Sequence, residues 1–242
     1  MTVLLEVRNL TRVFGALRAV DSVSFSVRPG ELLGLIGPNG AGKSTLYNLI
    51  AGAIEPSSGE IEFKGRPVAG WKPYQAARVG VARTFQIPKP YRHLSVIENV
   101  VLNALLHDTT VSAARESARA VLADVGLADH AEASVGILTV GLLKRLEVAR
   151  ALALRPSLVL FDEIMAGLTP GEVREMTRLV ASLSARGITV IWVEHVLYAI
   201  MKTAPRIMVL HRGELIADGT PERVTKDPAV IQAYLGEEMS LA

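Results

Sequence analysis

The sequence predicts an α/β fold with a mostly parallel core sheet, an antiparallel β-rich part at the N-terminus and an inserted helical part. Three observations predict it. Residues 3–36 carry short apolar runs separated by turns, as strands do. Residues 88–156 instead carry helical signals. From residue 157 onward, strand patterns alternate with helix starts, which is typical of a parallel sheet whose strands are joined by helices.

The length of 242 residues favours one large domain with an inserted subdomain. We expect the core, with its β subdomain, to span about 1–87 and 157–242, and the helical subdomain about 88–156. Half of the residues are hydrophobic and 21% are charged. This composition excludes a disordered chain and a collagen-like one.

Charge, cysteine content and hydropathy narrow the functional classes. The net charge is only +2 and the basic residues form no stripe, so the sequence does not indicate a nucleic-acid-binding protein. The absence of cysteine excludes disulfides, thiolate metal sites and a cysteine nucleophile. Apolar runs such as Ile188–Val193 fall far short of the ~20 residues that span a bilayer, so we expect no transmembrane segment. The mean hydropathy of +0.32 fits either a large core or a partner-facing surface.

The first third predicts four strands and one helix. The strands are expected at Val3–Val7, Val23–Val27, Leu32–Ile36 and Glu60–Phe63. The run Leu32–Ile36 is apolar throughout and lies between turn residues, which indicates a strand buried on both faces. A helix is expected from Lys43 to about Ile50, directly after a glycine-rich loop.

The middle third predicts helices. Ser95 and Glu98 have the spacing of a capping box before an apolar run. The Ala-rich stretch from Ser112 to Val125 predicts a second helix. A third is expected to begin at Thr139 and to stop at Pro156.

The last third returns to alternating strands and helices. Buried strands are expected at Leu158–Phe161 and Ile188–Val193. Between them, Thr169 followed by Pro and Glu predicts a helix start, and Gly187 its end. Beyond them, residues 207–210 and 215–217 predict a hairpin, and Thr220 begins another helix.

A nine-residue motif between the strand 32–36 and the helix that follows predicts a phosphate site. It fits the pattern G-x-x-x-x-G-K-[ST] and consists of Gly37, Pro38, Asn39, Gly40, Ala41, Gly42, Lys43, Ser44 and Thr45. Glycines let successive N–H groups point at phosphate oxygens, and the helix N-terminus adds its positive dipole end. Lys43 can reach the β- and γ-phosphates of a nucleotide, and the Ser44 hydroxyl can bind Mg²⁺.

Acidic and imidazole side chains follow two further buried strands. Asp162 and Glu163 come directly after an apolar run, where Asp162 can orient Mg²⁺ and Glu163 can accept a proton from an attacking water. His195 follows the run 188–193 and Glu194. Ligands of open α/β sheets gather at the carboxyl ends of strands, so we expect His195 to sense the γ-phosphate.

Taken in order, these motifs resemble the nucleotide-binding subunit of an ABC transporter, over nearly the whole chain. Within that family, several stretches look like the ATPases that energise branched-chain amino-acid uptake. They are Ala82 to Gln86, Leu146 to Leu152, Ala166 to Leu168, Val193 to His195, and Ala233 to Glu237. The resemblance implies the P-loop fold of ABC ATPases and Mg²⁺-dependent ATP hydrolysis coupled to transport.

The resemblance also assigns roles. It implies that Phe14 stacks on adenine, that Gln86 contacts Mg²⁺ or the attacking water, that Glu163 is the general base and that His195 contacts the γ-phosphate. Two subunits are expected to pair head to tail, so that the signature segment of one completes the other's site. The signature residues are Leu138, Thr139, Val140 and Gly141.

Partners and location follow from the same resemblance. We expect transmembrane permease subunits, a second identical or different ATPase, and indirectly a periplasmic solute-binding protein, with the chain at the cytoplasmic face of the inner membrane. The segment 87–100, which includes Pro88, Pro90, Tyr91, Arg92 and His93, is expected to form part of the groove that receives the permease.

Some residues depart from the family pattern. The usual signature Leu-Ser-Gly-Gly-Gln reads Leu138-Thr139-Val140-Gly141-Leu142, and both Ile164 and Thr169 stand where the family usually has other residues. These changes bear on dimerisation and on the hydrolysis rate rather than on nucleotide binding. Three alternatives remain open: the ATPase of another ABC system such as lipopolysaccharide export, a soluble ABC ATPase without a transport role, and a regulatory cassette that does not hydrolyse ATP.

Overall fold

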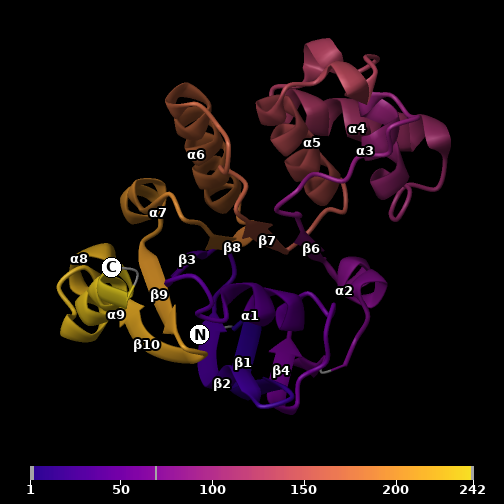
Figure 1. Cartoon of the computed structure of the whole chain (residues 1–242). Coiled ribbons are helices and arrows are strands. Elements are labelled where there is room, and N and C mark those ends of the chain that lie inside the picture. Colours follow the sequence, from indigo (N-terminus) through magenta and orange to yellow (C-terminus); the bar gives the residue numbers. More distant parts are fainter. Residues whose placement is uncertain (1–2, 69, 241–242) are drawn as a thin grey trace.

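The computed structural model describes residues 3–68 and 70–240, without the side chains of 235–240. Two sheets and their covering helices make up this part of the chain (Figure 1). The strands are β1 (Leu5–Phe14), β2 (Leu17–Val27), β3 (Leu32–Ile36), β4 (Ser58–Phe63), β5 (Arg66–Pro67), β6 (Val81–Arg83), β7 (Leu158–Asp162), β8 (Thr189–Val193), β9 (Arg206–His211) and β10 (Glu214–Gly219).

The helices follow the order that the α/β prediction requires. They are α1 (Lys43–Ile50), α2 (Pro73–Val79), α3 (Val96–Ala104), α4 (Val111–Asp124), α5 (Val140–Leu152), α6 (Pro170–Ala185), α7 (Leu197–Thr203), α8 (Pro221–Val224) and α9 (Pro228–Ser240). Two short 3₁₀ turns, Ala128–His130 and Val135–Ile137, precede α5. Among the described residues, no helix combines the length and the apolar character needed to cross a membrane.

The first sheet is antiparallel and has the order β2-β1-β4-β5. Strand β1 is longer than the predicted Val3–Val7, because it pairs with β2 on one side and β4 on the other. The second sheet has the order β10-β9-β3-β8-β7-β6. Its strands are parallel except for the pair β9–β10, which is the predicted hairpin. The predicted fold class is therefore confirmed.

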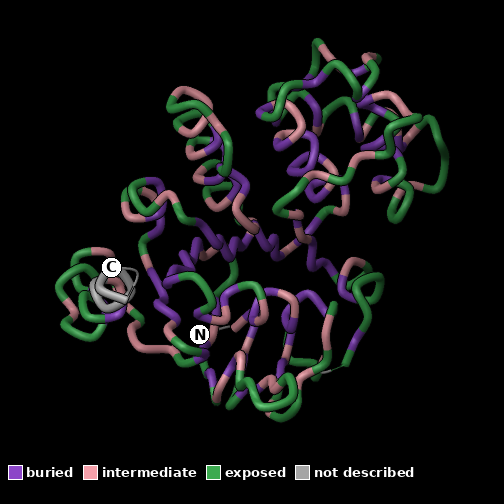
Figure 2. Tube along the Cα trace, in the orientation of Figure 1, coloured by how far each residue is buried: buried purple, intermediate pink, exposed green. Residues whose placement is uncertain are grey.

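Both faces of the main sheet are covered, and each face has its own core. In Figure 1, helices α6 and α7 and the helical insertion α3–α5 lie on one side of the sheet, and α1 and the first sheet lie on the other. Alternate side chains of β3 divide accordingly. Leu32 and Ile36 join the core of the insertion side, whereas Leu33 and Leu35 join the core around α1. The central strands are buried along their whole length (Figure 2).

The predicted helix starts are present. Ser95 caps α3 with Glu98 in a capping box, Thr139 caps α5, and Thr169 caps α6. Sequence reasoning missed α9, and it missed α2 and α7, which have seven residues each. Their caps are Lys72 and Val196, residue types that are not preferred N-caps, so neither start stands out in the sequence.

Candidate functional site

The loop between β3 and α1 is shaped by its glycines. Gly37, Gly40 and Gly42 have positive φ angles of 151°, 74° and 101°. A Cβ atom on Gly37 would lie 2.1 Å from the Leu210 carbonyl oxygen, and one on Gly42 would lie 2.3 Å from that of Ala19. Only glycine fits at these two positions, which keeps the loop folded tightly around the N-terminus of α1.

Lys43 lies over this loop. Its Nζ donates hydrogen bonds to the carbonyl oxygens of Gly37 and Pro38, both at 2.7 Å, and the residue is 6% exposed. The ammonium is therefore held at the mouth of the loop, beside the backbone N–H groups at the start of α1. Positive charge and N–H donors at one helix N-terminus form an arrangement suited to phosphate.

A hollow of about 560 Å³ opens in front of the loop. The hollow joins the loop to residues from other parts of the chain, which the sequence alone could not place together. Its lining consists of Leu17, Arg18, Ala19, Asn39, Gly40, Ala41, Gly42, Lys43, Ser44, Thr45, Glu163, His195 and Arg212. Two of the predicted catalytic residues thus face the predicted phosphate loop.

The carboxylate of Glu163 is held from both sides. Gln86 Nε2 donates to Glu163 Oε2 at 2.5 Å, and His195 Nε2 lies 2.7 Å from Glu163 Oε1. The Glu163 side chain is 14% exposed, and its backbone has a φ of 48°, which is uncommon for a residue other than glycine. The structure therefore brings together three residues that the sequence analysis had singled out separately.

Asp162 is partly buried beside this group. Its backbone N–H donates to Thr84 Oγ1 at 3.2 Å. Burial raises the pKa of the Asp162 carboxyl above its usual value, and the neighbouring Glu163 carboxylate raises it further. A cation beside Asp162 would oppose both effects. The oxygen donors of Asp162, Ser44 and Gln86 are of the kind that Mg²⁺ prefers, so the donor set fits this ion.

Two buried charged residues near the site were missed by sequence reasoning. Glu194 is 2% exposed, and its Oε1 accepts a hydrogen bond from Met165 N at 2.7 Å. Burial raises its pKa to about 7. Lys144 of α5 is 3% exposed and donates to the carbonyl oxygens of Gln86 and Glu163. The available signal was that both charges interrupt apolar patterns of buried elements.

Phe14 and the signature segment lie apart from the hollow. Phe14 is 43% exposed, and its ring lies under the Arg12 guanidinium, 4.5 Å from ring centroid to Cζ. It does not line the hollow, and neither do the residues Leu138 to Gly141. Thr139 instead caps α5 by accepting from Leu142 N at 3.3 Å, and Val140 is 54% exposed. Their assigned contacts with nucleotide stay predictions.

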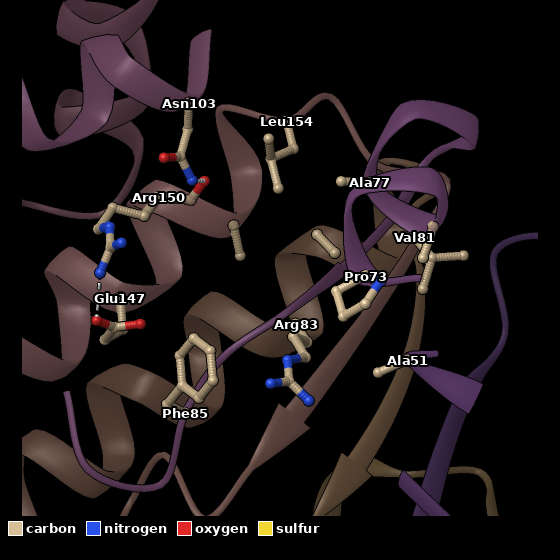
Figure 3. A pocket seen from close by; sticks show the side chains of 13 residues that line it. Ala51, Pro73, Ala77, Val81, Arg83, Phe85, Asn103, Glu147, Arg150 and Leu154 are labelled. Atoms are coloured by element: carbon tan, nitrogen blue, oxygen red, sulfur yellow. Dashed lines mark hydrogen bonds and ion pairs between the residues drawn. The ribbon is translucent and has the colours of Figure 1, made fainter. Parts of the chain in front are cut away.

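A second hollow, of about 160 Å³, lies between α2 and α5 (Figure 3). Its lining comes from the core and from the helical insertion: Ala51, Pro73, Ala76, Ala77, Val81, Ala82, Arg83, Phe85, Asn103, Glu147, Arg150, Ala151 and Leu154. None of the residues 87–100, where the groove was expected, belongs to it. That segment is hydrogen-bonded to α5 and α3: Arg150 Nη1 donates to Lys89 O at 2.8 Å, and Tyr91 N donates to Asn99 Oδ1 at 2.7 Å.

Comparisons with known proteins identify the family of the chain. A family model described as ABC transporter matches residues 20–166, and one described as Branched-chain amino acid ATP-binding cassette transporter matches residues 214–239. The high-affinity branched-chain amino acid transport ATP-binding protein BraF of Pseudomonas aeruginosa is 37% identical over 97% of this chain and 98% of its own length. LivG of Salmonella typhimurium, which has the same description, is 38% identical with the same coverage.

The fold agrees with these matches. The crystal structure of an ATP-binding cassette of an ABC transporter in its ADP conformation has a TM-score of 0.88 and 31% identity, and the match covers 98% of this chain and 100% of that one. The match at residues 214–239 favours amino-acid uptake over lipid export. The chain belongs to the ATP-binding proteins of ABC transporters, in the branched-chain amino acid subfamily.

Proposed function

We propose that the chain hydrolyses ATP with Mg²⁺ and thereby energises the uptake of branched-chain or related hydrophobic amino acids across the inner membrane. The observation that carries the proposal is the Glu163 carboxylate, held between Gln86 and His195 at the edge of the hollow in front of the phosphate loop. A carboxylate fixed at both oxygens beside a phosphate site is suited to orient a water and accept its proton.

The nucleotide is bound by the loop and by the residues around it. The residues Gly37 to Thr45 hold the phosphates through N–H groups and the Lys43 ammonium, whose present carbonyl partners are weak competitors for a phosphate. Phe14 stacks on the adenine. When bound, Mg²⁺ neutralises charge on the phosphates, and Ser44, Gln86 and Asp162 are the residues that would hold it.

The chain's own residues then favour hydrolysis. Glu163 takes the proton of the attacking water. His195, at hydrogen-bond distance from Glu163, fixes the orientation of that carboxylate and contacts the γ-phosphate. Lys43 and the N-terminus of α1 stabilise the negative charge that develops on the phosphate oxygens.

A complete transporter supplies the remaining parts. A second ATP-binding subunit pairs head to tail with this chain, so that the signature residues Leu138 to Gly141 reach the partner's nucleotide. Permease subunits dock at the hollow between α2 and α5, because it joins the core to the helical insertion and ends at Phe85, next to Gln86 (Figure 3). A periplasmic solute-binding protein delivers the amino acid, and the chain acts at the cytoplasmic face of the membrane.

The base assignment is tested by Glu163→Gln in the purified full-length chain. We expect ATP binding to persist while turnover falls by about 100-fold or more, because general base catalysis typically contributes that much. Glu60→Gln, at an exposed acid of β4, serves as the matched control. Turnover near the wild-type rate in Glu163→Gln would refute the assignment.

The transport assignment needs a separate experiment. The tagged chain is purified from native membranes in mild detergent, and co-purifying proteins are identified by mass spectrometry. Two multispanning proteins and a second ATP-binding subunit are expected, and vesicles containing them, supplied with the solute-binding protein, should take up labelled leucine with ATP. Co-purification with export-type membrane proteins alone would contradict the uptake proposal.

A further inference from the structure

One buried cation links the helical insertion to the two residues that meet at the catalytic carboxylate. Lys144, in α5, donates to the main-chain carbonyl of Gln86 and, at 3.0 Å, to that of Glu163. The side chains of the same two residues also bond each other, Gln86 Nε2 to Glu163 Oε2. The ammonium therefore holds the backbone carbonyl groups of Gln86 and Glu163, and the side chains of these two residues form the hydrogen bond at the proposed base.

Stability alone does not account for this cation. Removing an ammonium from water is unfavourable, and apolar residues often replace buried ion pairs without loss of stability. Burial accordingly lowers the pKa of Lys144, whereas four nearby carboxylates favour its charged form. These are Glu147 on α5, Asp162 at the end of β7, Glu163 directly after it, and Glu194 after β8. A flexible chain with three donors is suited to hold separate carbonyl groups at fixed positions.

The backbone of Glu163 needs such support. Its φ of 48° lies in the left-handed region, which is unfavourable for a residue with a Cβ and persists only where surrounding contacts hold it. Three contacts hold the backbone of this residue: Glu163 N donates to Val193 O at 2.9 Å, and Glu163 O accepts from Lys144 and, at 3.3 Å, from Ala166 N. The first comes from the sheet, and Lys144 supplies the contact from α5.

We propose that Lys144 is a positioning residue, which sets the main chains of Gln86 and Glu163 so that the amide and the carboxylate meet in the geometry required for hydrolysis. The inference rests on the proposed role of Glu163 as the base. Because α5 begins at the signature residues, the helix expected to reach the partner's nucleotide also supports this chain's own base. A displacement of α5 from the core would separate Gln86 from Glu163.

The test compares steady-state ATP hydrolysis, ATP binding and thermal midpoint in full-length variants. Lys144→Met keeps the length of the side chain and removes the donors. We expect kcat to fall about 10- to 100-fold, as small misplacements of catalytic groups do, while KM and the ATP dissociation constant stay near wild type. Lys144→Arg, which keeps a cation and donors, should recover most of kcat.

Arg145→Met is the matched control. Arg145 also lies on α5, and its Nη1 donates to the Val125 carbonyl oxygen with a hydrogen-bond length of 2.8 Å, but this contact is not part of the site. The variant should keep kcat near wild type. In a Gln86→Ala background, Lys144→Met should lower kcat by a smaller factor, because the amide to be positioned is already gone. If Lys144→Met does not fold, Lys144→Leu, which also lacks donors, gives the same comparison.

Two results would overturn the inference. One is a kcat of Lys144→Met near wild type, and the other is an equal loss in Lys144→Met and Arg145→Met that follows their thermal midpoints. The wild-type chain is measured in the same series. If it binds ATP without hydrolysing it, the proposed function fails, and this outcome is distinct from a failure of the positioning role.

Discussion

Glu194→Gln tests whether burial raises the pKa of the carboxyl group next to His195 in the folded protein. Glu194 lies between β8 and His195, is 2% exposed, and accepts a hydrogen bond from Met165 N. Burial raises its pKa from 4.5 to about 7. A glutamine of the same shape keeps the accepting oxygen but cannot ionise, so it reports on the charge alone.

The direction of the pH effect follows from which state binds the proton more tightly. The folded protein does so, since its pKa is the higher one. The stabilisation is therefore fully present below pH 4.5 and is lost as pH rises through about 7. At roughly 1.4 kcal/mol per pH unit, the loss amounts to about 3 kcal/mol. In a chain of this length, that corresponds to a change of about 6–12 °C in Tm.

The assay is thermal and urea unfolding of wild type and Glu194→Gln between pH 5 and pH 8. At pH 5 the free energies of unfolding of the two proteins should differ by less than about 1 kcal/mol, because the folded side chain is neutral in both and pH 5 lies close to the unfolded-state pKa of 4.5. At pH 8 the variant should be the more stable by about 3 kcal/mol. Glu60→Gln, at an exposed position, controls for the loss of one acid elsewhere. A difference between variant and wild type that is independent of pH would refute the reasoning.

Two further predictions concern the phosphate loop and its helix. Tyr47→Phe removes the hydroxyl that donates to the Thr84 carbonyl at 2.5 Å, and it should lower the free energy of unfolding in urea by about 1–3 kcal/mol. An unchanged unfolding midpoint would show that this buried bond contributes nothing. Gly37→Ala places a Cβ atom 2.1 Å from the Leu210 carbonyl oxygen, so it should weaken ATP binding in equilibrium dialysis by at least about 10-fold. Wild-type affinity would mean that the loop tolerates the displacement.

Local sequence patterns predicted the helices and strands whose ends are marked by their own residues. The strand Leu32–Ile36 and the helix Lys43–Ile50 agree with the structure to the residue, because an apolar run and a glycine-rich loop mark their ends. Helices α2 and α7 were not predicted. They have seven residues each and begin after Lys72 and Val196, which are not preferred N-cap residues, so their starts carry little local signal.

In the candidate site too, some residues could be predicted from local sequence patterns, whereas the contacts between them could not. Glu163 and His195 could be proposed because each follows an apolar strand, whereas Gln86 was singled out only by resemblance. The contacts among the three depend on how the ends of separate segments meet, which the structure supplies. Lys144 and Glu194 were not predicted: a charge inside an apolar pattern marks each of them, but their partners are distant in sequence.

The order of strands in the main sheet also constrains how the protein is made. Strand β3 leads into the phosphate loop, yet its two neighbours are β8 and β9, from the last quarter of the chain. During synthesis, which proceeds from the N-terminus, an apolar strand with both edges unpaired must wait until nearly the whole chain has left the ribosome. The nucleotide site is therefore among the last parts to form. A chain that ends before β8 and β9 is expected to aggregate through its unpaired β3 strand rather than to act as an ATPase with reduced activity.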